Sequence, residues 1–376
     1  MTDVYKLYAF AHSLYSGRAR SYLIKSGIPF RELSTGHESY KAEVLPKGKV
    51  PTIPTLVTPQ GEVVRDGAKI IEHFEAASGR PFLPKTPRQQ IVSAIFDLIG
   101  TEGLMRPAMH YRWNFLDENE AFSHYHFLYS QRDMPQREEK TRYMMGKMQS
   151  AAVMFGVSDD SKSLVETLYR EFLSALNQHL TEQPYLLGWK PCIGDFGLLA
   201  PMYAHLGRDP MPSTLMKQTA VRVYRWVERM NRADQDAPEF FDAKEDYLVA
   251  DEIPDTLVNV LRIIAEDLVP ETHAQAEVIN QWLADNQPQP GTPAQGRLAE
   301  GVYGPAEFSV RGQSLTSITG SYRFVMLQRV QQLYAALDTL GQTAVEELLE
   351  TCGLSQLLAI KLDRRLGWSD NQDVWL

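Results

Sequence analysis

The feature that most constrains the fold is the alternation of strand-like and helix-like segments near the N-terminus. Residues 4–10 are rich in aromatic side chains that alternate with polar ones, a pattern that predicts a strand. Residues 17–26 place their apolar side chains on one helical face, and Gly27 is expected to end that helix. Residues 28–33 predict a second strand. The chain therefore opens with a β-α-β unit, which favours a parallel pair of strands.

A hairpin and a helix follow this unit. Residues 55–58 and 62–64 flank a Pro-Gln-Gly turn, and residues 68–77 turn Ile70, Ile71 and Phe74 to one side. The order βαβ-ββα predicts a small α/β domain, which we place at residues 1–84.

Strand patterns disappear after the proline-rich segment at residues 80–87, and helical periodicity takes over. We expect an all-helical domain at residues 88–237 and a mainly helical C-terminal extension at residues 238–376. The predicted segments of the extension are helices at 256–268 and 273–284, a surface loop at 286–296, a short strand at 308–310 and two helical runs that end at LDRRLGW.

Composition narrows the class of protein. No run of about 18 apolar residues occurs, and the N-terminus lacks the pattern of a secretion signal, so we expect a cytoplasmic protein without a membrane partner. A net charge of −9 argues against nucleic-acid binding. Cys192 and Cys352 are far apart in apolar helical contexts, which disfavours a disulfide or a zinc site, and we predict no metal.

Four stretches, spaced along residues 4–231, resemble motifs of the glutathione transferase superfamily. They are SLYSGRAR, LPKGKVPTIPTL, VVRDGAKIIEHF and PYLLGWKPCIGDFGLLAPMY. The resemblance implies a thioredoxin-like N-terminal domain followed by an all-α domain of the glutathione-transferase type. It also implies glutathione as co-substrate and a homodimer.

The first motif concerns the glutathione thiol, whose unperturbed pKa is about 8.5, so that a transferase must stabilise the thiolate. Ser13 stands where the zeta class of the family has its serine and the omega and beta classes have a cysteine, so it is the expected hydrogen-bond donor. Tyr15 is the alternative donor, and Arg18 could supply positive charge. Ser16 is expected to cap the following helix. The absence of a loop cysteine disfavours thiol-transferase chemistry.

The second motif implies a cis Val50–Pro51 bond. In the family, the residue before this proline offers its backbone to the cysteinyl part of glutathione, as an added strand does. Non-enzymatic thioredoxin folds keep the proline too, so Pro51 has an equally good structural explanation. Lys49 could meet the glycyl carboxylate or could be a solvated loop residue.

The third and fourth motifs depart from the family pattern. The resemblance implies that Asp66 pairs with the γ-glutamyl amino group, but Gly67 replaces the usual serine and leaves only its backbone N–H for a carboxylate. We therefore expect glutathione binding to be weakened or re-angled, but not abolished. Cys192 replaces the usual Ser/Thr before Asp195, which could cost about 1 kcal/mol of helix stability, and Asp195 is expected to be structural.

An aromatic and Met-rich segment with basic residues could form the pocket for an electrophile. Its members are Met105, Arg106, Met109, His110, Tyr111 and Trp113. Such a stripe is more often part of a core, but basic groups beside aromatic rings would suit a small aromatic or acidic substrate.

Two functions follow from these patterns. The first is a glutathione transferase-like enzyme that activates the thiol of glutathione for attack on a small electrophile, by conjugation, ether cleavage, dehalogenation or isomerisation. The alternative is a non-catalytic binding or scaffold protein with the transferase fold, which Gly67, Cys192 and the long extension favour.

Overall fold

A four-stranded mixed sheet forms the N-terminal part of the chain, of which the structure, a computed structural model, describes residues 4–241, 244–294 and 303–376. The strands are β1 (Tyr5–Tyr8), β2 (Phe30–Leu33), β3 (Thr55–Val57) and β4 (Val63–Arg65), in the order β2-β1-β3-β4. β1 runs parallel to β2, and the β3–β4 hairpin is antiparallel, as the sequence predicts.

Two helices pack together beside this sheet. α1 (Ser16–Lys25) ends just before Gly27, which has a φ of 64°, and α3 (Gly67–Ser78) buries Ile70 and Ile71. The π-helical turn η1 (Tyr40–Val44) and the short α2 (Leu45–Gly48) connect β2 to β3. The sheet and these helices make a thioredoxin-like fold, and the predicted β-α-β and β-β-α units are confirmed.

The middle of the chain is helical. Its elements are α4 (Pro87–Leu98), the π-helical turn η2 (Ile99–Gly103), α5 (Met105–Trp113), α6 (Leu116–Ser130), α7 (Arg137–Met154), α8 (Lys162–His179), α9 (Ile193–Ala204), α10 (Pro210–Thr219) and α11 (Val221–Arg229). At the start of α9, the fully buried Asp195 carboxylate accepts the N–H of Cys192 at 2.9 Å and Nε1 of Trp226 at 2.9 Å. Asp195 is therefore structural, as expected. Its bond to the N–H of Cys192 is the hydrogen bond that the third helical residue makes to the N-cap residue in a capping box.

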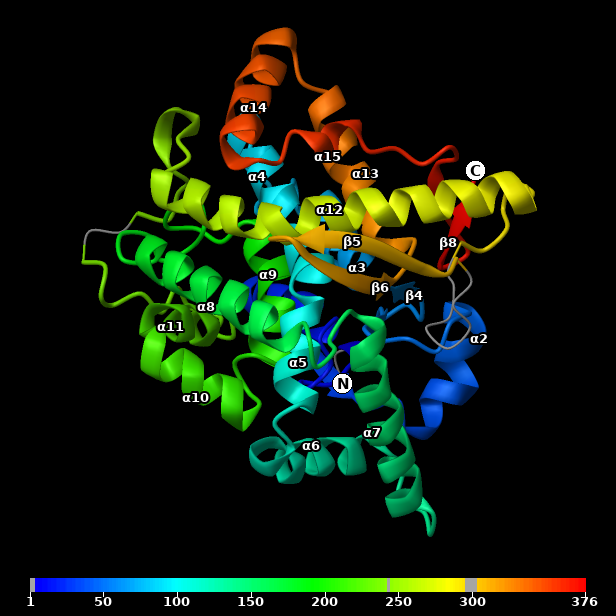
Figure 1. The fold of residues 1–376 in the computed structure, drawn as a ribbon. Coiled ribbons are helices and arrows are strands. Elements are labelled where there is room, and N and C mark those ends of the chain that lie inside the picture. The colour runs from blue at the N-terminus through cyan, green and yellow to red at the C-terminus, as the bar shows by residue number, and fades with distance from the viewer. Residues whose placement is uncertain (1–3, 242–243, 295–302) are drawn as a thin grey trace.

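The C-terminal extension wraps back over both preceding parts (Figure 1). Its elements are the 3₁₀ turn η3 (Val249–Asp251), α12 (Asp255–Asn286), the hairpin β5 (Pro305–Val310) and β6 (Gln313–Ile318), α13 (Tyr322–Ala335), α14 (Thr339–Cys352), α15 (Gln356–Ala359) and the hairpin β7 (Leu366–Ser369) and β8 (Gln372–Trp375). α12 packs against α8, whereas α13 and α14 pack against α4.

Two predictions for the extension are wrong in detail. The two helices expected before residue 286 are one helix, because α12 buries apolar side chains on both sides of Pro270 and these contacts hold it together across the missing N–H. The segment LDRRLGW, expected to end a helical run, leads into the strand β7. The strand predicted at 308–310 is confirmed, and it is longer than expected because β5 begins at Pro305. The last two residues of the predicted loop at 286–296 lie outside the described residues.

The hairpin β7–β8 docks the end of the chain onto the thioredoxin-like sheet. Its turn residues Asp370 and Asn371 have φ values of 47° and 60°, which suit a tight hairpin turn. Asn371 accepts hydrogen bonds from the N–H and from Nε of Arg65 on β4, and Trp375 is fully buried. No helix in the described ranges combines the length and apolar character needed to cross a bilayer.

Candidate functional site

A cavity of about 520 Å³ lies between the thioredoxin-like sheet, the start of α5 and the extension. The sheet side contributes Tyr15, residues 49–54 and Asp66, the helical side contributes Glu102, Met105 and Arg106, and residues 318–323 close it from the extension. The structure thus brings seven of the predicted site residues to one cavity: Tyr15, Lys49, Val50, Pro51, Asp66, Met105 and Arg106.

Tyr15 presents an unused hydroxyl to this cavity. The residue occupies the position just before α1, at the positive end of that helix, and its hydroxyl forms no hydrogen bond with a described residue. Burial, and then the nearby Glu102 and Asp66 carboxylates, raise the pKa of the Tyr15 phenol well above its usual value. The side chain is nevertheless 37% accessible, because it faces the cavity. Tyr15 is therefore a neutral donor with room for an acceptor.

Ser13 and Ser16 have other surroundings. Ser13 is half-buried and is not among the residues that line the cavity, and its described contacts are backbone hydrogen bonds to Phe10 and Ser16. The expectation that Ser16 caps α1 is wrong, since the helix begins at Ser16 and the hydroxyl accepts the N–H of Phe10 at 3.4 Å. Through this bond Ser16 links the segment that follows β1 to the start of α1.

Arg18 is buried beneath the site and paired. Its guanidinium forms an ion pair with Asp97 of α4, and both side chains are almost inaccessible. Burial alone would lower the pKa of Arg18, but the Asp97 carboxylate raises it. The charge of Arg18 is therefore committed to Asp97.

The cis peptide bond lies at Ile53–Pro54, and the expectation of a cis Val50–Pro51 bond is wrong. The stretch KVPTIP contains two X-Pro steps three residues apart, and Pro54 is the one that directly precedes β3. Ile53 lines the cavity, and neither its N–H nor its C=O bonds to a described residue. Ile53 thus has the backbone groups that the resemblance assigns to Val50.

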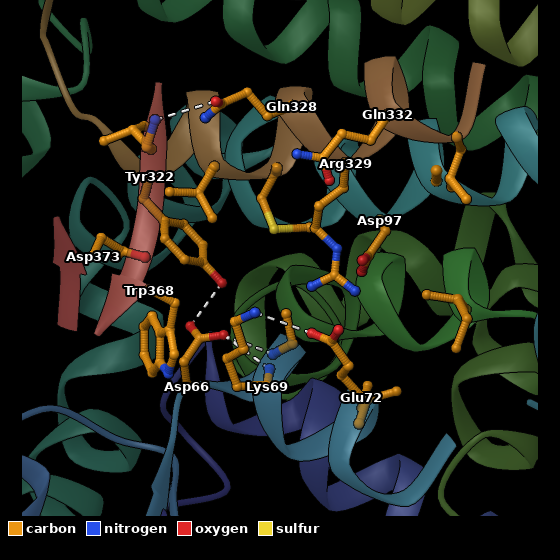
Figure 2. A pocket seen from close by; sticks show the side chains of 18 of the residues that line it. Asp66, Lys69, Glu72, Asp97, Tyr322, Gln328, Arg329, Gln332, Trp368 and Asp373 are labelled. Atoms are coloured by element: carbon orange, nitrogen blue, oxygen red, sulfur yellow. Dashed lines mark hydrogen bonds and ion pairs between the residues drawn. The ribbon is translucent and has the colours of Figure 1, made fainter. Parts of the chain in front are cut away.

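Residues of the extension already contact two of the predicted glutathione ligands. Lys49 Nζ lies 3.3 Å from the carboxylate of Asp370, in an exposed ion pair. Asp66 caps α3 by accepting the N–H groups of Ala68 and Lys69 through Oδ1, and its Oδ2 accepts the hydroxyl of Tyr322 at 2.7 Å (Figure 2). Asp66 adopts a φ of 80° and a ψ of 136°, a conformation that is costly for a residue with a side chain.

Gly67 is explained by crowding. A Cβ at this position would lie 3.3 Å from Cδ of Arg18 and 3.4 Å from the carbonyl oxygen of Tyr15. Because Arg18 is buried and ion-paired, it has little freedom to move away. The serine that the family usually has here would therefore be poorly accommodated.

The predicted electrophile pocket is divided between cavity and core. Met105 and Arg106 line the cavity, whereas Met109, His110, Tyr111 and Trp113 are buried in the helical core. His110 bonds Glu166 at 3.1 Å, and burial lowers its pKa. Arg106 is ion-paired with Asp267 and Glu271 of α12, so its charge is neutralised.

Glu102 is a cavity residue that the sequence reasoning missed. It lies on the π-helical turn η2, a conformation that occurs often at functional sites, and its carboxylate forms no hydrogen bond or ion pair with a described residue. Burial, opposed by Arg323 and helped by Glu271, raises the pKa of Glu102 from 4.5 to about 7. The available signal was a single acidic residue between two glycines in the apolar run LIGTEGLM.

The comparisons with known proteins agree with the N-terminal motifs. The sequence model of the family described as glutathione S-transferase, N-terminal domain, matches residues 7–82. No curated protein matches the chain.

Several solved structures are similar to the chain. One is a glutathione S-transferase from Xanthobacter autotrophicus Py2, with 21% identity and a TM-score of 0.35 over 60% of this chain and 91% of that one. A second is the beta-etherase LigF from Sphingobium sp. strain SYK-6, with 17% identity and a TM-score of 0.42 over 64% and 99%. A third is a glutathione S-transferase from Methylobacterium radiotolerans JCM 2831 in complex with glutathione sulfonate, with 15% identity and a TM-score of 0.37 over 66% and 99%.

The thioredoxin-like sheet and the family match at residues 7–82 lead to one conclusion: the N-terminal domain of this chain is a domain of the glutathione S-transferase N-terminal type.

Proposed function

We propose that the chain binds glutathione in the cavity that contains Tyr15 and activates its thiol as the thiolate for attack on a small electrophile. The observation that carries this proposal is the unengaged Tyr15 hydroxyl at the positive end of α1, beside the unpaired backbone groups of Ile53. The Ile53 backbone would hold the cysteinyl part of glutathione as a strand edge does, and the Tyr15 O–H would donate to the sulfur.

Glu102 would accept the proton that the thiol of glutathione loses. A carboxylate that faces the same cavity and has a pKa of about 7 can accept this proton near neutral pH, and it can return the proton to a leaving group. When Glu102 takes the proton, the negative charge moves from the carboxylate to the sulfur and the total charge of the cavity is unchanged. Conjugation, ether cleavage, dehalogenation and isomerisation all begin from this thiolate.

The cavity wall favours an aromatic electrophile over an acidic one. Met105, Phe155 and Ile318 present apolar surface, whereas the charge of Arg106 is neutralised by Asp267 and Glu271. An aromatic ring would gain contact with this wall, while an acid would find no free cation from Arg106.

The test is the ionisation of bound glutathione. Calorimetry should detect glutathione binding, and ultraviolet titration should place the pKa of the bound thiol below its solution value. Tyr15→Phe should raise the pKa of the bound thiol and Ser13→Ala should leave it unchanged. The opposite pair of results would assign the role to Ser13, and glutathione that neither binds nor ionises would refute the enzyme.

A non-catalytic binding or scaffold protein is the second candidate. It is supported by the contacts of Tyr322 with Asp66 and of Asp370 with Lys49, because the extension then occupies groups that glutathione would use. This candidate predicts no measurable glutathione binding even when Tyr322 is changed to Phe.

A further inference from the structure

Two polar groups face the cavity of Tyr15 without a partner. The Tyr15 hydroxyl forms no hydrogen bond with a described residue, and the side chain is 37% accessible. Glu102 is half-buried, and its carboxylate forms neither a hydrogen bond nor an ion pair within the part of the chain that the structure describes. Unlike Oδ1 of Asp267, which is buried without a partner, the Glu102 oxygens retain accessible surface. A ligand in the cavity can therefore reach both groups.

The two groups come from different walls of the cavity. Tyr15 precedes α1 on the side of the thioredoxin-like sheet, whereas Glu102 lies on η2 in the helical part. After burial, the Glu102 carboxylate contributes most to the raised pKa of the Tyr15 phenol, so the two groups lie close enough to interact. A small molecule between them would meet an acceptor on one side and a donor on the other.

The charged side chains around Glu102 are already paired with one another. Glu271 of α12 pairs with Arg106 of α5 at 3.0 Å and with Arg323 of α13 at 2.8 Å, and Arg106 also pairs with Asp267. These four side chains carry two positive and two negative charges. They are therefore neutral as a group and leave the Glu102 carboxylate without a counter-ion.

The sheet side of the cavity offers no second base. Asp66 caps α3 through Oδ1 and accepts the Tyr322 hydroxyl through Oδ2 (Figure 2). Among the described residues that line this cavity, Glu102 is therefore the carboxylate left to act on a ligand. Burial raises the pKa of Glu102 to about 7, so near neutral pH it can both accept a proton and give one back. Tyr15 stays a neutral donor, because its pKa lies well above the usual value.

A base and a neutral donor across an apolar space suit proton transfer at carbon. When a base removes a hydrogen from the carbon beside a ketone, the C–H electron pair forms a C=C bond and the carbonyl oxygen becomes negative. A phenol O–H aimed at this oxygen stabilises the charge as it develops, and the effect is larger where water is excluded. Met105, Phe155 and Ile318 supply the apolar surface against which such a ketone would pack.

We propose that the cavity of Tyr15 and Glu102 catalyses the enolisation of a small apolar ketone without glutathione. The Glu102 carboxylate takes the hydrogen beside the carbonyl as a proton, and the Tyr15 O–H donates to the enolate oxygen. Glu102 then returns the proton to carbon, either to the same atom or, in a β,γ-unsaturated ketone, to the γ carbon, which moves the double bond into conjugation. The reaction needs no oxidant or further reactant, and it does not rest on the proposed transferase function.

The experiment follows deuterium exchange of 2-tetralone in D2O by proton NMR, with the full-length chain and no glutathione. 2-Tetralone is an aryl ketone with acidic benzylic hydrogens beside its carbonyl, and the proton on Glu102 can exchange with solvent before it returns to carbon. The rate above the buffer background should rise with pH and level off, with a midpoint at about pH 7, because the Glu102 carboxylate is the active form.

Variants assign the two roles. Glu102→Gln should lower the rate above background by about 100-fold or more, the usual contribution of a general base, and Tyr15→Phe should lower it by about 100-fold, the usual contribution of an oxyanion donor. Glu118→Gln on α6 and Tyr143→Phe on α7 are matched changes at exposed residues and should leave the rate unchanged.

The pH profile separates a lost role from a lost fold. Tyr15→Phe keeps the base, so its slower exchange should still have a midpoint near neutral pH, and a flat profile would exclude Glu102 as the base. No exchange above background in the parent chain, or exchange that survives Glu102→Gln, would overturn the proposal.

Adding glutathione separates this activity from the transferase. Glutathione that binds and suppresses the exchange would show that both reactions use one cavity. Exchange in a chain that does not bind glutathione would support the enolisation and refute the transferase, whereas glutathione binding without any exchange would do the reverse. Exchange that continues unchanged with glutathione bound would overturn the assignment to this cavity.

Discussion

The hydroxyl of Tyr322, the first residue of α13, donates a 2.7 Å hydrogen bond to Oδ2 of Asp66, the residue that caps α3. The two residues are 256 positions apart in the chain. In the proposed enzyme this bond competes with the amino group of glutathione for the same carboxylate oxygen. We therefore expect the extension to lower the affinity of the site for glutathione through this bond, in addition to lining the cavity.

Tyr322→Phe should therefore tighten glutathione binding, by about tenfold if the freed Oδ2 accepts a charged donor. Calorimetry on the parent and variant chains measures the change. Tyr334→Phe is the matched control, because Tyr334 lies on the same helix but its hydroxyl bonds the exposed Glu346. Weaker binding in Tyr322→Phe would mean that the Tyr322 hydroxyl helps to hold glutathione.

Glu102 should make the stability of the fold depend on pH. Its pKa rises from 4.5 to about 7 on folding, so the folded chain holds this proton more tightly than the unfolded chain. The resulting stabilisation is complete below pH 4.5 and is lost as the pH rises to about 7. The side chain introduced by Glu102→Gln does not titrate. The free energy of unfolding of this variant should therefore lack the decrease expected for the parent chain, which is about 3 kcal/mol at most.

Urea unfolding of both chains across this pH range is the measurement. Because the Glu102 carboxyl faces the cavity, solvent there will reduce the difference below its upper limit. Curves that stay parallel for the parent chain and Glu102→Gln would show that the carboxylate is well solvated, and Glu102 would then be a poor proton acceptor at neutral pH.

The sequence was sufficient for the thioredoxin-like domain because its signals are local. The alternation in β1, the one-sided periodicity of α1 and the stop at Gly27 each act within about ten residues. The position of the cis bond was not decided locally, since both Pro51 and Pro54 follow a β-branched residue in the same loop. Only the start of β3 distinguishes them.

The hydrogen bond between Tyr322 and Asp66 could not be predicted in the same way. Nothing in the residues around Tyr322 specifies Asp66 as a partner, and the pairing follows from how α13 packs against α4. The same holds for the aromatic and Met-rich segment from Met105 to Trp113. Its helical periodicity does not distinguish residues that line the cavity from residues in the core. Tertiary packing places Met105 on the cavity and Tyr111 in the core. The place of Glu102 on the cavity depends on a π-helical turn, and the residues of that turn carry no periodic pattern that would predict it.

Asn371 should anchor the end of the chain. Its side chain accepts the N–H of Arg65 and donates to the carbonyl oxygens of Val63 and Lys47, at 3.0 to 3.2 Å. Asn371→Gly keeps the positive φ of the turn and the carbonyl that Arg65 Nε uses, but it removes these three bonds. We expect a loss of about 1–3 kcal/mol in unfolding free energy and faster hydrogen exchange at the Arg65 amide.

The neighbouring residue supplies the control for this change. Among the described residues, the side chain of Asp370 pairs only with the exposed Lys49, so Asp370→Asn should alter stability by less than about 1 kcal/mol. Equal losses in the two variants would show that the turn, and not the Asn371 side chain, holds the hairpin on β4.

Gly67→Ser tests whether the departure from the family pattern is a defect in the glutathione site or a requirement of this fold. The new Cβ would lie 3.3 Å from Cδ of Arg18, whose ion pair with Asp97 keeps it in place. We therefore expect a loss of about 1–3 kcal/mol in unfolding free energy, the usual cost of overpacking, and no gain in glutathione affinity. Gly67→Ala isolates the effect of the Cβ from that of the hydroxyl. A serine variant that is as stable as the parent and binds glutathione more tightly would show that Arg18 can yield, and that the missing hydroxyl is what weakens the site.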